Sequence, residues 1–61
     1  MLTIYTRDVD QDMQMLRRSA YGRSLGAELP SVISYLRSLD TDSYSAAMQS
    51  VDLAMAAYAM V

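Results

Sequence analysis

Residues 22–29 read Gly-Arg-Ser-Leu-Gly-Ala-Glu-Leu, a pattern typical of the end of one helix followed by the start of the next. Gly22 can adopt the left-handed backbone conformation that ends a helix. Ser24 can then cap the following helix by accepting a hydrogen bond from its first turn. Because Leu25 and Leu29 lie four residues apart, they begin an apolar face. The stretch therefore predicts two consecutive helices joined by a short turn.

Residues 2–7 alternate between apolar and polar side chains and are rich in β-branched and aromatic residues. This alternation predicts a short β-strand. A single short strand is not stable without a partner, and no later stretch of the chain offers one, so we expect it to pair with the same strand of a second copy. A frayed arm, or an extension of the first helix, is the alternative. One face of the strand would carry Leu2, Ile4 and Thr6, and the other Thr3, Tyr5 and Arg7.

The helix before the turn is predicted over residues 8–21. Its apolar positions recur at helical spacing and form one stripe. Either Asp8 or Asp10 is the expected N-cap, because an acidic side chain suits the start of a helix. The stripe consists of Val9, Met13, Leu16 and Ala20.

Pro30 leaves open where the helix after the turn begins. A helix that begins just after Ser24 would hold Pro30 in its second turn, where the proline ring and the missing N–H would kink it. A helix that begins at Pro30 would hold that residue comfortably in its first turn. In either case the apolar face consists of Leu29, Val32, Ile33, Leu36 and Leu39.

The last helix is predicted over residues 43–61, after a polar break in which Asp40 or Asp42 is the expected N-cap. This stretch is rich in Ala and Met, which favour helix. Its alanines widen the apolar surface on several sides, so the helix either packs on its own domain or binds a partner. Five larger side chains follow the four-three spacing of a coiled-coil seam. They are Tyr44, Met48, Val51, Met55 and Tyr58.

The length of the chain points to self-association. A chain of 61 residues buries little of its own surface and commonly needs a disulfide, a metal or a partner subunit. Because it has no Cys and no His, we expect a homodimer or a higher oligomer. Residues 1–39 are predicted to form a strand-helix-helix dimerisation core, and residues 40–61 a separate amphipathic helix. No secretory signal or membrane span is visible, so a cytoplasmic protein is expected.

Charge is unevenly distributed along the chain. Residues 1–39 carry five Arg and four acidic residues, whereas residues 40–61 carry three Asp and no base. All the cations are Arg, which suits bidentate pairing with phosphate, carboxylate or guanine. The formal net charge of −2 is not the basic footprint usual in DNA-binding proteins, although two sets of Arg can converge in a dimer.

The sequence argues against an enzyme and against a metal or cofactor site. It contains no His, Cys or Lys and no glycine-rich phosphate loop, so no acid–base or nucleophilic centre is expected. Residues 8–12 have the acidic spacing of a calcium loop. However, Met13 stands where that loop needs Gly, and Ser19 where it needs Glu. We therefore predict no catalytic residues, no metal, no cofactor and no small-molecule substrate.

The order of strand, short helix, Gly-Arg-Ser turn and second helix resembles the ribbon-helix-helix family of DNA-binding proteins, which includes Arc- and MetJ-type repressors and many antitoxins. The resemblance rests on residues 22–25 and 28–29, with residues 2–7 upstream, and it covers residues 2–39. It implies a mainly α fold with a short N-terminal strand and two to three helices. Two chains would pair their strands into a ribbon that enters the major groove.

The same resemblance implies roles for individual residues. Thr3, Tyr5 and Arg7 would face the bases, while Arg23 and Ser24 would hold a backbone phosphate. The protein would be a small homodimeric transcriptional regulator or antitoxin, and its residues 43–61 would bind a second protein. The expected dimer and partner interface consists of Leu2, Ile4, Leu29, Ile33, Leu36, Tyr44, Met48, Val51, Met55 and Tyr58.

The alternative from a different class is an all-α interaction protein. Residues 8–24, 30–39 and 43–61 would then form a helical hairpin or bundle that dimerises. Such a protein would bind and inhibit another protein through an apolar helix face, as small phage- or plasmid-encoded inhibitors do.

Overall fold

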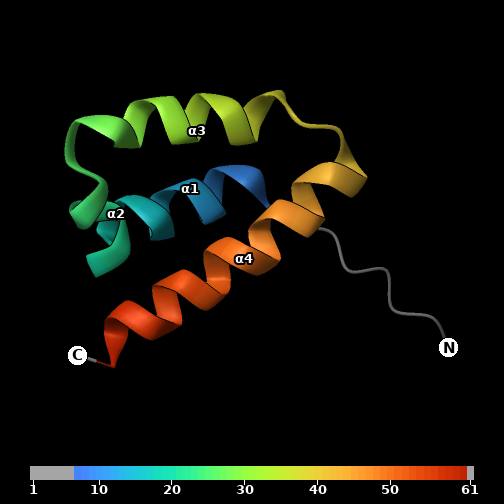
Figure 1. The fold of residues 1–61 in the computed structure, drawn as a ribbon. Coiled ribbons are helices and arrows are strands. Elements are labelled where there is room, and N and C mark those ends of the chain that lie inside the picture. Colours follow the sequence, from blue (N-terminus) through green and yellow to red (C-terminus); the bar gives the residue numbers. More distant parts are fainter. Residues whose placement is uncertain (1–6, 61) are drawn as a thin grey trace, which may run out of the picture.

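The computed structural model describes residues 7–60, which form four α-helices and one 3-10 helix (Figure 1). Over this part of the chain there is no strand, so the mainly helical prediction is confirmed and the architecture agrees with the all-helical alternative. Residues 2–6 of the predicted strand lie outside the described residues, and Arg7 is not in a strand. The elements are α1 (Val9–Arg18), α2 (Ala20–Leu25), the 3-10 helix η1 (Gly26–Glu28), α3 (Leu29–Ser38) and α4 (Thr41–Ala59).

Aspartates cap α1 and α4, as predicted. Asp8 Oδ1 accepts a hydrogen bond from the Gln11 backbone N–H at 3.2 Å, and Asp40 Oδ1 accepts one from the Ser43 backbone N–H at 2.8 Å. The bonds from Ser43 hold the pKa of Asp40 below its ordinary value, because they stabilise the charged carboxylate. Both aspartates also place negative charge at the positive end of a helix dipole.

Ser19 separates α1 from α2 at a point where the sequence predicted a continuous helix. Its Oγ accepts a hydrogen bond from the Gly22 backbone N–H at 2.9 Å and donates one to the Leu16 carbonyl oxygen at 2.7 Å. One hydroxyl therefore closes α1 and caps α2. The sequence contained a signal for this break, since Arg17 and Arg18 suit the last turn of a helix and serine suits the cap of the next.

The predicted turn at Gly22 and Ser24 is wrong. Gly22 is buried inside α2, and a Cβ at this position would lie 1.8 Å from the Leu16 carbonyl oxygen. Glycine is therefore required here by the close approach of two backbones. Ser24 Oγ donates to the Tyr21 carbonyl oxygen at 2.6 Å and caps no later helix. Gly26, with a φ of 56°, ends α2 instead.

The structure shows where the helix that contains Pro30 begins, which the sequence left open between two positions. α3 begins at Leu29, so Pro30 occupies its second position, where the missing N–H would have no partner within the helix. The start near Ser24 is excluded, because η1 lies between α2 and α3 and carries the chain into α3.

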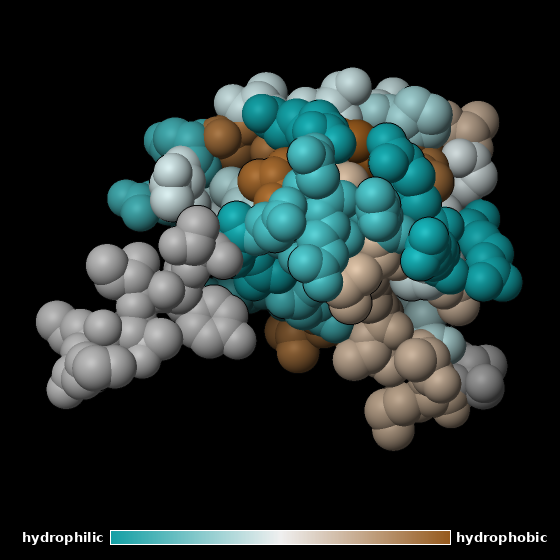
Figure 2. All heavy atoms as spheres, turned by 180° about the vertical axis from the view of Figure 1, so that it is seen from behind, coloured by the Kyte–Doolittle hydropathy of each residue, from teal (hydrophilic) through white to brown (hydrophobic). Residues whose placement is uncertain are grey.

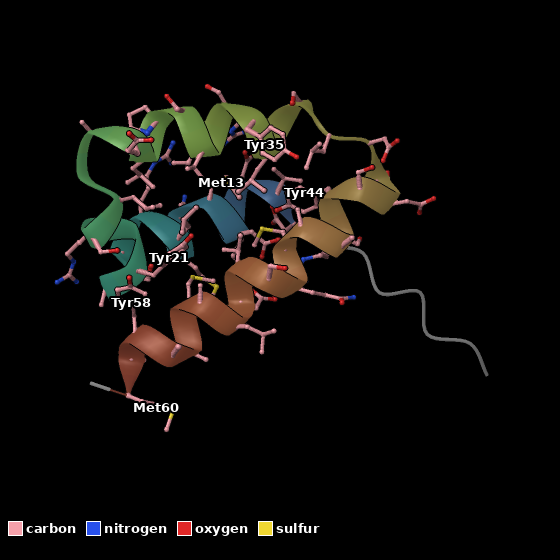
Figure 3. The ribbon with its side chains drawn as sticks, in the orientation of Figure 1. Met13, Tyr21, Tyr35, Tyr44, Tyr58 and Met60 are labelled. Atoms are coloured by element: carbon pink, nitrogen blue, oxygen red, sulfur yellow. The ribbon has the colours of Figure 1, made fainter. Side chains whose placement is uncertain are left out.

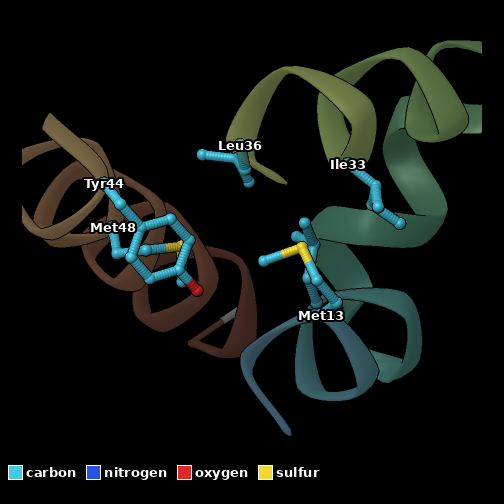
Figure 4. Close-up of a cluster of buried hydrophobic side chains, with 6 residues drawn as sticks. Met13, Ile33, Leu36, Tyr44 and Met48 are labelled. Carbon is cyan, nitrogen blue, oxygen red and sulfur yellow. The ribbon is translucent and has the colours of Figure 1, made fainter. Parts of the chain in front are cut away.

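Six buried side chains from three helices form the core (Figure 4). In Figure 4 they converge from α1, α3 and α4 on a common centre. The core therefore draws on both sides of residue 39, where the sequence suggested a division. Burial of one such side chain stabilises the fold by roughly 1.5–3 kcal/mol, so each is a large share of the stability of a chain this short. The six are Met13, Leu16, Ile33, Leu36, Tyr44 and Met48.

α4 contacts both α2 and α3. Near its C-terminal end, the ring of Tyr58 lies 5.3 Å from the ring of Tyr21 between centroids, at a tilt of 53° (Figure 3). Such a tilted aromatic pair adds to the stabilisation that burial provides. No helix within residues 7–60 combines the length and the apolar character needed to cross a membrane.

Candidate interaction surface

The apolar stripe that the sequence assigned to a partner faces the core of its own chain. We call its five residues, Tyr44, Met48, Val51, Met55 and Tyr58, the inner face of α4. Tyr44 and Met48 are buried, and Val51 and Met55 pack partly buried against the core. Tyr58 remains 44% exposed beside α2. The first four side chains are therefore occupied within the chain, which corrects their assignment to a dimer or partner interface, whereas the assignment of Tyr58 stays a prediction.

The α3 residues of the predicted interface also pack within the chain. Ile33 and Leu36 are core residues, and Leu29 packs partly buried against the core. Packing within one chain uses their apolar surface, so the assignment of these three to an interface is corrected as well. Leu2 and Ile4 lie outside the described residues, and their part in a dimer stays a prediction.

A second stripe with the same four-three spacing runs along the opposite side of α4. We call it the outer face. All its side chains are exposed, and its two large members, Leu53 and Met60, are 73% and 87% exposed. Figure 2 shows the C-terminal end of α4 as a continuous apolar surface. The outer face consists of Ser43, Ala46, Ser50, Leu53, Ala57 and Met60.

The outer face carries no charge. The only charged residue between Ser43 and Met60 is Asp52, which lies on the flank of the helix and pairs with Arg7. A helix that is apolar on two opposite sides is usually buried on both, and exposed apolar surface that is continuous usually marks an interaction site. The outer face is therefore the candidate functional surface of this protein.

The other exposed large apolar side chains are isolated. Met15 on α1 is surrounded along its helix by exposed Gln and Arg, and Tyr35 on α3 by exposed Ser. Single apolar residues of this kind are normal on protein surfaces. They do not form a second candidate surface.

Arg7, predicted to read bases, ties α1 to α4. Its Nε lies 3.1 Å from Asp12 Oδ2, and its Nη2 lies 3.0 Å from Asp52 Oδ2. The hydroxyl of Tyr44 donates to the same Asp12 oxygen at 2.8 Å. Reading guanine would require Arg7 to leave two carboxylates, at the cost of this network. Thr3 and Tyr5 lie outside the described residues.

Replacing Tyr44 with Phe is expected to lower the free energy of unfolding by about 1 kcal/mol, because Asp12 loses a partly buried hydrogen-bond donor. Burial, followed by the bond to Asp12, holds the pKa of Tyr44 above its ordinary value. In the unfolded chain this hydroxyl ionises near pH 10. Its contribution to stability is therefore complete below about pH 10 and is lost as the pH rises further.

Urea unfolding at neutral pH and at about pH 10–11 tests this expectation. The variant should be less stable at neutral pH, and it should lack the part of the alkaline loss that comes from Tyr44. Tyr35→Phe is the matched control, because Tyr35 is 61% exposed on α3. Equal effects of the two substitutions would contradict a role for the Tyr44–Asp12 bond.

The predicted phosphate site at Arg23 and Ser24 does not form. Both residues lie late in α2, and the backbone N–H of Arg23 already donates to the Ser19 carbonyl oxygen at 3.1 Å. The Arg23 guanidinium donates to the Arg18 carbonyl oxygen at 2.9 Å. A phosphate site of the expected kind needs unpaired N–H groups at the start of a helix, and these residues do not provide them.

A groove of about 340 Å³ lies between α1 and α3. Arg37 lines this groove, and its Nη2 lies 3.0 Å from Asp10 Oδ1. The polar residues that line the groove are all exposed. Within residues 7–60 there is also no group of three or more acidic side chains that could hold a metal ion. The groove is lined by Arg17, Leu29, Pro30, Ile33, Ser34 and Arg37.

Searches against protein-family models, curated proteins and solved structures each gave no match.

Proposed function

We propose that this protein is a small helical module that binds another protein chain through the outer face of α4. The observation that carries the proposal is the exposure of Leu53 and Met60 on an uncharged stripe with coiled-coil spacing. Large apolar side chains at this spacing insert between the side chains of a facing helix. The natural partner segment is therefore an amphipathic helix.

The composition of the outer face suits this role. Its Ser and Ala positions let a facing helix approach closely, while Leu53 and Met60 supply the apolar contact. Met is unbranched and flexible, so it adapts to partners of different shape. These properties favour helix-on-helix binding over the binding of a small molecule.

The inner face of α4 supports the proposal in a second way. Met48 and Tyr44 anchor the helix in the core, and Arg7 holds Asp52 from the flank. A helix fixed in this manner presents its outer face already ordered. Binding then costs less conformational entropy than it would for a segment that folds on its partner.

A photoreactive amino acid at position 53 tests the proposal in cells that produce the protein. We expect a covalent adduct with a protein chain from position 53 and none from position 35, which is also exposed but lies on α3. Equal labelling from both positions, or none from position 53, would contradict the proposal.

Leu53→Asp is expected to weaken partner binding by tenfold or more, because it places a charge in an apolar contact. The free energy of unfolding should change by less than about 0.5 kcal/mol, since Leu53 is 73% exposed. The check combines urea unfolding with the yield of adduct from a photoreactive residue at position 57. An unchanged yield would place the binding surface elsewhere.

A DNA-binding regulator of the ribbon-helix-helix type is the second candidate. The observation in its favour is a group of exposed arginines, Arg17, Arg18 and Arg23, that form no ion pair with any acidic residue within residues 7–60. We expect the affinity for DNA to fall as the salt concentration rises. The slope of log affinity against log salt concentration should become shallower when Arg18 and Arg23 are replaced by Ala. Absence of binding at low salt would remove this candidate, and with it the antitoxin role.

A further inference from the structure

We infer that the outer face of α4 binds the outer face of a second copy of this chain, with the two helices antiparallel. The inference rests on the proposed function, because it names the occupant of the same surface. Three properties of the outer face point to this occupant: the order of its large and small side chains, the positions of the nearby charges, and the length of helix available for contact.

When two copies of α4 lie antiparallel, the large side chains of one outer face lie opposite the small side chains of the other. In an antiparallel pair centred between residues 51 and 52, Leu53 of one copy faces Ser50 of the other, and Met60 faces Ser43. Ala46 and Ala57 face one another. Every large side chain thus meets a small one, which lets the two helices pack closely along their whole length.

A parallel pair lacks this complementarity. It would set Leu53 against Leu53 and Met60 against Met60, while the serines and alanines would face each other across gaps. Gaps of this kind lose the dispersion contacts that close packing provides. The alternation of small and large residues therefore selects the antiparallel arrangement.

Charge favours the same arrangement. Asp40 and Asp42 lie at the start of α4, whereas Arg23 lies on α2, which packs beside the inner face of α4 near the C-terminal end of that helix (Figure 1). Antiparallel pairing turns the acidic start of each α4 toward the basic end of the other copy. A parallel pair would bring the two acidic starts together.

The length of the contact predicts a weak dimer. Residues 43–60 span about 27 Å of helix, and two such faces bury on the order of 1,000 Å² in total, near the lower limit for a specific interface. The contact is symmetric, so each copy supplies the same residues and the assembly closes at two chains. We therefore expect a dimer whose population rises with concentration in the micromolar range.

Disulfide trapping tests the geometry, because the natural chain contains no Cys. We expect an equimolar mixture of the Ser43→Cys and Met60→Cys variants to form the mixed disulfide on mild oxidation. Met60→Cys alone should form little disulfide, since the two positions 60 lie at opposite ends of an antiparallel pair. A Met60→Cys homodimer that forms faster than the mixed disulfide would overturn the antiparallel arrangement.

Sedimentation equilibrium of the purified full chain tests whether it dimerises. We expect a monomer–dimer equilibrium whose dissociation constant rises at least tenfold in Leu53→Asp, with Gln14→Asp on α1 as a control that leaves it unchanged. A chain that stays monomeric at millimolar concentration would overturn the inference. The proposed function would still stand if position 53 gave an adduct with a different protein in cells, and it would fall as well if no adduct formed.

Discussion

Replacing Met48 with aspartate is expected to unfold the protein. The Met48 side chain is fully buried, and it lies in a core of only six residues. An aspartate there would place a carboxylate among apolar side chains, with no cation within the core to pair with it. Such a charge costs several kcal/mol, whereas a chain of this length is stabilised by roughly 3–9 kcal/mol in all.

Circular dichroism and urea unfolding measure the effect directly. Leu53→Asp is the matched control, because it makes the same chemical change on the outer face of the same helix, where the side chain is 73% exposed. We expect the control to keep its helical signal and its unfolding midpoint. If both variants folded equally well, α4 would not be oriented with Met48 toward the core.

Replacing Gly22 with alanine is expected to lower the free energy of unfolding by about 3 kcal/mol or more. The added Cβ would lie 1.8 Å from the Leu16 carbonyl oxygen and 2.9 Å from its carbon. Both are backbone atoms, so no side chain can rotate away to make room. The junction of α1 and α2 must open, and the hydrogen bonds of Ser19 that hold it must lengthen or break.

Gly26→Ala separates this steric effect from the general cost of replacing a glycine. A Cβ at Gly26 would meet nothing within 4 Å, and the only penalty comes from its φ of 56°. Because its ψ of −124° lies outside the left-handed helical region, that penalty is about 1–3 kcal/mol. Urea unfolding should still rank Gly22→Ala as the more destabilising of the two, and the reverse order would contradict the close approach of α1 and α2.

Much of the helical framework could be predicted from the sequence because it depends on local interactions. The spacing of Met13 and Leu16, and of Ile33 and Leu36, predicts the faces that are buried in the core. The caps at Asp8 and Asp40 follow from side chains that bond backbone groups three residues away. Such contacts involve neighbours in the chain and leave a direct trace in the residue pattern.

The break at Ser19 was missed because two signals competed. The stripe that ends at Ala20 continues past Ser19 at helical spacing, and Gly22 offered a more familiar way to end a helix. The structure instead uses Gly22 for a close contact between α1 and α2. Contacts between segments that pack in space have no counterpart in local spacing.

The residue pattern alone predicts that α4 is a helix with apolar side chains on more than one side. Packing in three dimensions places Tyr44 and Met48 in the core, pairs Arg7 with Asp12 and Asp52, and leaves the outer face exposed. The pattern could not predict these contacts because the inner and outer faces share the same four-three spacing. Spacing measures whether side chains lie on one side of a helix, whereas packing against α2 and α3 determines which side is covered.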